Sequence, residues 1–217
     1  MPFCIVRPMN DQRDKIMNAR TGLRIGTWLG VVVVCVFAFA KWQAAQEADR
    51  PQQLAWQQTY QQNLWAPVQQ RTLTLAGVER VLGQGSLWMI SADGEPRLVS
   101  RHQLESDDRQ WRLQAVIALD EQQTASLVEA QAWQPDSPDQ AVSPAVGQAL
   151  AAYLVDRISM IPDQPLTLGH IEGTFGPAEV RMPVSQGEAW IYPRQGVVVA
   201  VSDEQAHSIM FGLHEEL

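Results

Sequence analysis

Hydrophobic and polar positions divide the chain into one long apolar run near the N-terminus and a following stretch of short periodic segments. The run from Leu23 to Trp42 reads LRIGTWLGVVVVCVFAFAKW. A helix needs about 20 apolar residues to cross the hydrocarbon core of a bilayer. We therefore expect a transmembrane helix over 25–42, preceded by a tail at 1–24 and followed by a polar connector at 43–51.

Charges beside this run predict its orientation. The tail holds five basic side chains against two acidic ones: Arg7, Arg13, Lys15, Arg20 and Arg24 against Asp11 and Asp14. The positive-inside bias then predicts a single-pass protein of the bacterial inner membrane, with the N-terminus in the cytoplasm and the C-terminal domains in the periplasm. The alternative is a cleaved signal peptide, because Ala38-Phe39-Ala40 is an A-x-A pattern after an apolar stretch.

The next segment predicts two helices followed by strands. Apolar residues recur at three- and four-residue steps from Leu54 to Val68, which predicts an amphipathic helix over 52–70 with Pro67 near its end. In LTLAGVERVLG, at 73–83, Thr74 is placed to cap a short helix and Gly83 to end it. Alternating patterns then predict strands at 86–91, 96–101, 109–120 and 124–133.

The same order of elements is predicted a second time. A linker at 135–143 is followed by a helical stripe from Val146 to Ile161 and by LTLGHIEGTFG at 166–176. Strands are predicted at 179–184, 187–193, 197–202 and 206–213, and 116–128 aligns with 198–210 without a gap. The expected fold class is α+β: a transmembrane helix, then two tandem modules at 52–134 and 144–217, each with two helices and a four-stranded antiparallel sheet.

The second module resembles a known family. LTLGHIEGTFGPAEV, the strand with Trp190-Ile191-Tyr192 and a valine-rich third strand resemble the SmpA/OmlA, or BamE-like, outer-membrane assembly lipoprotein domain. The tandem arrangement is similar to the fold of the β-lactamase inhibitory protein. This resemblance covers about 52–213 and implies a protein-binding role. The chain differs from the family in having a predicted membrane anchor instead of a lipid-modified cysteine.

Composition and motifs argue against several classes of function. A net charge of -8 argues against a nucleic-acid groove. Both cysteines, Cys4 and Cys35, precede the predicted modules, so neither a disulfide nor a thiolate metal site is expected there. The histidines, His102, His170, His207 and His214, form no zinc-binding pair, and no nucleophile elbow or phosphate-binding loop is present. Three acidic pairs, Asp107-Asp108, Asp120-Glu121 and Asp203-Glu204, fall at predicted turns. We expect no enzyme activity, no cofactor and no metal.

The candidate binding residues are aromatic and cationic. In the strand at 109–120, alternate residues face opposite sides of the sheet. Trp111 and Leu113 are predicted to face the helices, and Arg112 is predicted to face away from them. Transferring this parity to the second module sends Val199 inward and Val198 to the open face. Trp190 and Tyr192 are then predicted to stand on the open face beside Arg181, a combination typical of binding hot spots. The alternative is that Trp190 packs in the core.

The sequence therefore predicts a membrane-anchored periplasmic interaction module, an accessory or assembly subunit that binds another envelope protein and no nucleic acid. The alternative function is a tethered inhibitor or regulator of a periplasmic enzyme, with 102–108 as the loop that would enter an active site. An enzyme of unfamiliar type would need a cleft joining His170 or His207 to carboxylates.

Overall fold

The computed structural model describes residues 34–41, 52–92 and 94–213 of the 217-residue chain. The chain divides into two compact units, Met1–Ala48 and Asp49–Leu217. In the first unit, residues 34–41 form a helix with exposed side chains. The predicted tail at 1–24, most of the predicted membrane span and the connector at 43–51 lie outside the described residues.

The described part of the chain contains no helix with the length and apolarity that a membrane crossing requires. Of the predicted span at 25–42, only the eight-residue helix at 34–41 is described, and a crossing needs about 20 helical residues. The prediction of a single-pass inner-membrane protein with periplasmic domains is therefore not supported.

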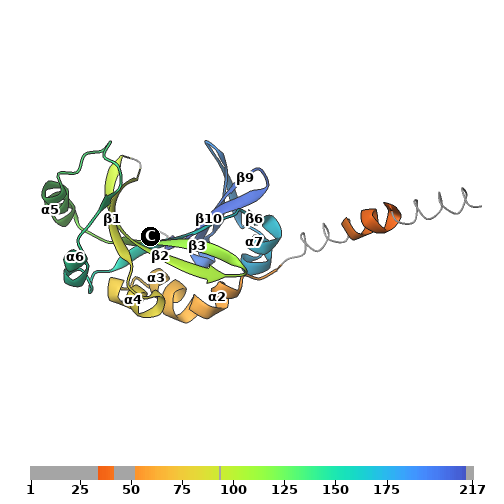
Figure 1. Ribbon diagram of the computed structural model, residues 1–217, viewed down its shortest axis with the longest axis horizontal. Coiled ribbons are helices and arrows are strands. Elements are labelled where there is room, and N and C mark those ends of the chain that lie inside the picture. Colours follow the sequence, from red (N-terminus) through yellow and green to blue (C-terminus); the bar gives the residue numbers. More distant parts are fainter. Residues whose placement is uncertain (1–33, 42–51, 93, 214–217) are drawn as a thin grey trace, which may run out of the picture. The chain divides into compact units, whose positions relative to one another are not determined.

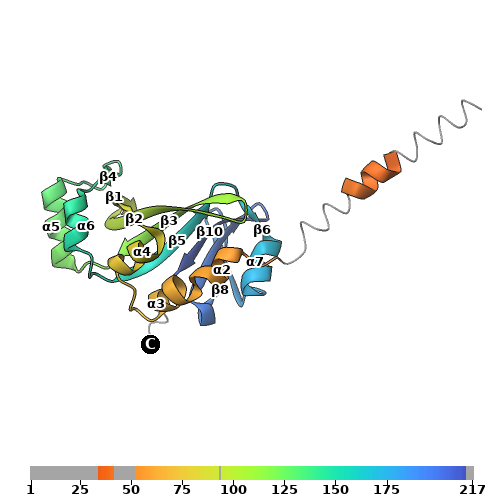
Figure 2. The ribbon, with the colours of Figure 1, turned by 60° about the horizontal axis from the view of Figure 1, so that its bottom comes forward.

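The second unit is built on a single antiparallel sheet of ten strands (Figures 1 and 2). The strands are β1 (Ser86–Ala92), β2 (Glu95–Ser106), β3 (Arg109–Ile117), β4 (Gln140–Ala141), β5 (Val155–Pro162), β6 (Leu166–Thr167), β7 (Val180–Val184), β8 (Gly187–Tyr192), β9 (Val197–Ser202) and β10 (Gln205–Phe211). Their order is β4-β1-β2-β3-β5-β10-β9-β8-β7, and β6 pairs with β10 off this path. The two-residue β4 and the proline-containing β7 therefore form the two ends of the sheet.

Helices cover one face of this sheet. They are α2 (Ala55–Tyr60), the π-helical turn η1 (Gln61–Trp65), α3 (Ala66–Gln69), α4 (Leu75–Leu82), α5 (Glu121–Gln131), α6 (Pro144–Ala149), α7 (Leu168–Phe175) and the 3₁₀ turn η2 (Pro193–Gln195). Within the second unit the sheet is curved, and α2, α3 and α4 lie on the outer side of the curve (Figure 1). We call the side that carries Trp111 and Leu113 the helix face, and the opposite side the open face.

The predicted fold class is wrong, because the unit is one sheet and not two four-stranded modules. Strand β5 joins the halves by pairing with β3 on one side and with β10 on the other, for example Met160 opposite both Leu113 and Ile209. One buried cluster also takes residues from both halves, including Trp56, Trp111, Val199 and Phe211. The halves therefore share their hydrogen-bonded ladder and their core.

Local signals nonetheless place many elements correctly. Helical turns run from Ala55 to Gln69, within the predicted helix at 52–70, and the π turn gives way to α3 at Ala66, next to Pro67. The Thr74 hydroxyl accepts a hydrogen bond from the Gly77 amide at 3.1 Å, which caps α4 as predicted. Gly83 and Gly176 end α4 and α7 with the same φ of 82°, a conformation that favours glycine.

Two predicted elements have the wrong secondary structure. Residues 124–133, predicted as a strand, belong mainly to α5, which begins with a reciprocal capping box between Asp120 and Gln123. The helix predicted from Val146 to Ile161 is instead the short α6 and strand β5. The gapless match of 116–128 to 198–210 thus aligns a helix with the β9–β10 hairpin.

Aromatic side chains fill the centre of the core. Trp56 lies edge-on to Trp65, Trp111 and Phe211, with ring centroids 5.4, 5.3 and 5.8 Å away. Trp65 stacks on Phe211 at 4.1 Å. These four rings come from α2, η1, β3 and β10, so the aromatic core holds the helix layer against both halves of the sheet.

Candidate functional site

Two of the four predicted site residues are buried on the helix face. Trp190 is 2% exposed and Tyr192 is 1% exposed. In the β8–β9 ladder Trp190 pairs with the buried Val199, and Tyr192 packs against Phe175 of α7 with ring centroids 5.5 Å apart. The prediction that Trp190 and Tyr192 stand on the open face is therefore wrong, and the core alternative for Trp190 is correct.

The burial of Tyr192 also changes its acidity. Burial, together with the nearby Glu172 carboxylate, raises the pKa of Tyr192 to about 12, against a smaller lowering by Arg181. The Tyr192 hydroxyl makes no hydrogen bond with the described residues. Tyr192 is thus a neutral core residue at ordinary pH.

Arg181 lies beside Trp190, as predicted, but on the helix face at the edge of the sheet. Its guanidinium carbon is 4.0 Å from the Trp190 ring centroid, and its Nη2 is 3.8 Å from Glu172 Oε1. This cation–π contact covers one side of the indole ring. Arg181 therefore protects the edge of the core, and a binding role for it stays a prediction.

Arg112 is exposed on the open face, where strand parity places it. Its cross-strand neighbours there are Gln103 on β2 and Ile161 on β5. Within the described residues Arg112 has no ion-pair partner. A surface arginine without an internal counter-ion is available to a ligand or a partner.

The end of the open face formed by β7 to β10 is apolar. Val180, Met182 and Val184 on β7 are 43%, 49% and 50% exposed. The ladder continues their face through Ile191 on β8, Val198 on β9 and Met210 on β10. We call these six residues the apolar patch, and the parity prediction that Val198 faces outward while Val199 faces the helices is confirmed.

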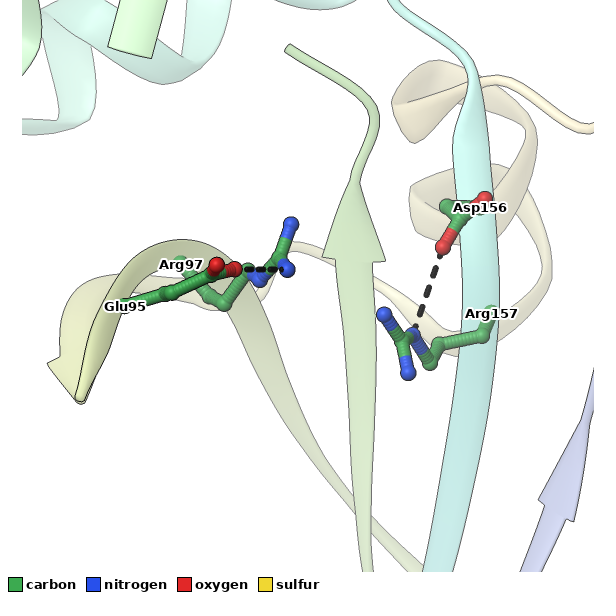
Figure 3. Close-up of polar contacts among 4 residues, drawn as sticks. All are labelled: Glu95, Arg97, Asp156 and Arg157. Atoms are coloured by element: carbon green, nitrogen blue, oxygen red, sulfur yellow. Dashed lines mark hydrogen bonds and ion pairs between the residues drawn. The ribbon is translucent and has the colours of Figure 1, made fainter. Parts of the chain in front are cut away.

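The other end of the open face carries arginines. Arg97 and Arg157 come from β2 and β5, and their guanidinium groups point toward one another across β3 (Figure 3). Each has its own carboxylate, Glu95 at 2.5 Å and Asp156 at 3.3 Å. These exposed pairs contribute little to stability. The open face is thus apolar at one end and carries paired and unpaired guanidinium groups at the other.

A cavity of about 860 Å³ lies where β1 begins. Trp88, Arg101, His102 and Arg112 are among the residues that line it. The Arg101 guanidinium lies over the Trp88 ring at 4.9 Å and binds Asp139 at 2.5 Å. This volume lies within the range of ligand-binding clefts.

His102 is the buried titratable group of this cavity. It is 5% exposed, its Nε2 lies 2.9 Å from Ser100 Oγ, and its ring also has a hydrogen bond with the Gly83 backbone. Burial lowers the pKa of His102 below its usual 6.5. The ring is therefore neutral at pH 7.

This burial predicts that acid destabilises the folded chain through His102. Between the lowered folded pKa and 6.5, the unfolded chain binds more protons, so the free energy of unfolding falls as pH drops below 6.5. One such group contributes a slope of at most about 1.4 kcal/mol per pH unit. Urea unfolding at pH 7.5, 6.5 and 5.5 should show a smaller loss for His102→Gln than for the wild type. His170, whose pKa burial also lowers, remains in both proteins, so equal losses would contradict the assignment.

The structure does not place the residues of the two alternative functions, a tethered inhibitor and an enzyme, as those functions require. Residues 102–108 belong to the β2–β3 hairpin, and Asp107 Oδ1 at its tip accepts a hydrogen bond from the Ala55 amide at 3.0 Å. This tip is tied to α2 and does not form the protruding loop expected of an inhibitor. His170 bonds to Thr167 Oγ1 at 2.8 Å, and neither His170 nor His207 lines the 860 Å³ cavity.

Comparisons with known protein families, with curated proteins and with solved structures give no match to this chain. The resemblance to the BamE-like family, and the binding function that it implies, therefore stay predictions.

Proposed function

We propose that residues 49–217 are a protein-binding module that docks another protein on the open face of the sheet. The observation that carries this proposal is the apolar patch. Val180, Met182 and Val184 are about half exposed in one row, although the described helices pack on the opposite face. Contiguous exposed apolar side chains on a soluble surface are typical of interaction sites.

The composition of the whole face supports a protein as the occupant. A protein interface combines an apolar centre with a polar rim that supplies hydrogen bonds. On the open face the apolar patch is followed across the sheet by Ser159 and Gln114 and then by Arg101. The proposal therefore requires no cofactor and no catalytic group, and an accessory subunit of a larger assembly is the role that fits it.

The test is a charge introduced into the apolar patch. The double variant Met182→Asp/Val184→Asp should reduce recovery of the partner at least about ten-fold, because two buried carboxylates at an interface centre lose their hydration. Partner recovery is measured by affinity purification of the full chain from its own cells, with quantitative mass spectrometry. Both positions are half exposed, so the melting temperature should change little.

The matched control is Gln122→Asp, which adds a negative charge on exposed α5, away from the open face. A partner that both variants retain equally would contradict the proposal. If the sedimentation coefficient of the chain rises with protein concentration, and the double variant loses this rise, the occupant would instead be a second copy of this chain.

A further inference from the structure

The open face lies on the inner side of the curved sheet. In Figure 1, β1 and β9 extend away from α2, α3 and α4 at opposite sides of the curve. The middle of this inner face carries small side chains, because Ala189, Ala200 and Ser208 are neighbours in the ladder of β8, β9 and β10. Ser159 continues them on β5, opposite Met210 of the apolar patch. A concave surface with small central side chains is complementary in shape to a convex element of a partner.

The strands under this surface use their backbone groups within the sheet. In the described sheet, β5, β8, β9 and β10 each have a hydrogen-bonded strand on both sides. The face therefore presents side chains to a partner, and the side chains of the apolar patch cannot pair with a backbone N–H or C=O. An extended segment on the patch would bury unpaired backbone groups, whereas a helix pairs these groups internally. The patch thus favours the apolar side of a helix.

Arg112 determines which charge that helix carries beside its apolar side. The Arg112 side chain is exposed on the open face, and neither Glu105 on β2 nor another described carboxylate forms an ion pair with it. Strand β5 separates β3 from β10, so Arg112 lies two strand spacings, about 10 Å, from the strand of Met210. A helix with its side chains is about 10–12 Å wide. A helix over β5 and β10 therefore contacts the apolar patch on one side and Arg112 on the other.

We propose that the open face binds an amphipathic helix of the protein partner, with acidic side chains along one border of its apolar side. The apolar side of this helix packs on the patch and over the small side chains of β8, β9 and β10. Its carboxylates accept hydrogen bonds from the Arg112 guanidinium on β3. This inference rests on the proposed function, because it assigns the secondary structure and the charge of the partner segment that docks there.

The experiment is an NMR titration of the ¹⁵N-labelled full chain at pH 7.5. The probe is a blocked peptide of about 20 residues, long enough to form a helix, with leucines on one side, glutamates along one border and glutamines elsewhere. Saturable shifts are expected at the amides of Val198, Ala200 and Met210. A control peptide with a central proline, which breaks the helix, should bind at least about ten-fold more weakly.

A second control peptide replaces the glutamates by glutamines. Because the chain has a net charge of -8, general electrostatics favours this neutral peptide, so weaker binding of it identifies a specific contact. Arg112→Gln should weaken binding of the glutamate peptide about three-fold, the effect of one exposed ion pair, and leave the glutamine peptide unchanged. Arg194→Gln, which removes an exposed arginine of η2, should change neither.

Three results would overturn the inference. They are the absence of saturable shifts up to about 1 mM peptide, where weak complexes register, equal binding of the helical and the proline-containing peptides, and equal effects of Arg112→Gln and Arg194→Gln. A thermal melt of each variant shows that the fold is intact. Capture of a partner that is lost in Met182→Asp/Val184→Asp but fully kept in Arg112→Gln would leave the proposed function standing and sink this inference alone. A partner that the double variant retains would contradict the proposed function, and this inference with it.

Discussion

Neither half of the second unit is expected to fold when the chain is divided at the predicted linker, 135–143. Residues 52–134 retain Trp56 and Trp111 but lose Phe211, against which Trp56 packs. They also lose β5, which pairs with β3, and the Tyr153 carbonyl, which accepts from the Leu75 amide at 2.9 Å. Each half is then too small to bury an adequate core.

Circular dichroism melts and ¹H–¹⁵N spectra of fragments 52–134 and 144–217 test this expectation. Each fragment alone should show no cooperative transition and poor amide dispersion. The control is the full chain with a protease site inserted at 135–139 and then cleaved, which keeps all strands together and should melt cooperatively. A cooperative transition in either isolated fragment would contradict the dependence of each half on the shared sheet.

Trp56→Ala should lower the free energy of unfolding by about 3–5 kcal/mol, the range for removing a large aromatic side chain from a core. Trp56 is 1% exposed and contacts three aromatic rings from three different elements. Its indole Nε1 has no hydrogen bond in the described part of the chain, so the loss comes from packing alone. Urea unfolding followed by far-UV circular dichroism measures the change.

Two further substitutions calibrate that measurement. Trp56→Phe keeps most of the ring and should cost less than half as much as Trp56→Ala. Trp88→Ala removes a partly exposed indole from the open face, together with its contact to Arg101, and should cost about 1 kcal/mol. If Trp56→Ala cost no more than Trp88→Ala, the central role of the aromatic core would be wrong.

Local periodicity predicted the elements that carry a clear cap or alternation, and comparison between the halves introduced the errors. Asp120 and Gln123 form a capping box, a direct signal for a helix at 121–131, which the alignment with the β9–β10 hairpin overrode. In β5 the buried positions Ile158, Met160 and Pro162 alternate, a period of two that a helical reading of 146–161 missed. Pairing between distant strands has no such local signal.

The face of the sheet on which a site residue lies was predictable where the alternation of apolar and polar residues came from the strand that holds that residue. The alternation of Trp111 and Leu113 placed Arg112 correctly on the open face. For β8 the parity was assumed, and a shift of one residue sends every side chain to the opposite face. The signal that would have corrected it is the size of Trp190 and Tyr192, since large aromatic side chains in a strand next to a helix usually pack beneath it.

The proline in the terminal strand has a consequence for solubility. A sheet of ten strands with valines and a methionine exposed at its rim is at risk of growing by stacking edge to edge with other molecules. Pro183 removes one backbone donor from β7, and at the opposite rim β4 offers only two residues for pairing. Both rims are thus poor templates for fibril-like extension, and the apolar patch remains available for side-chain contacts without inviting polymerisation.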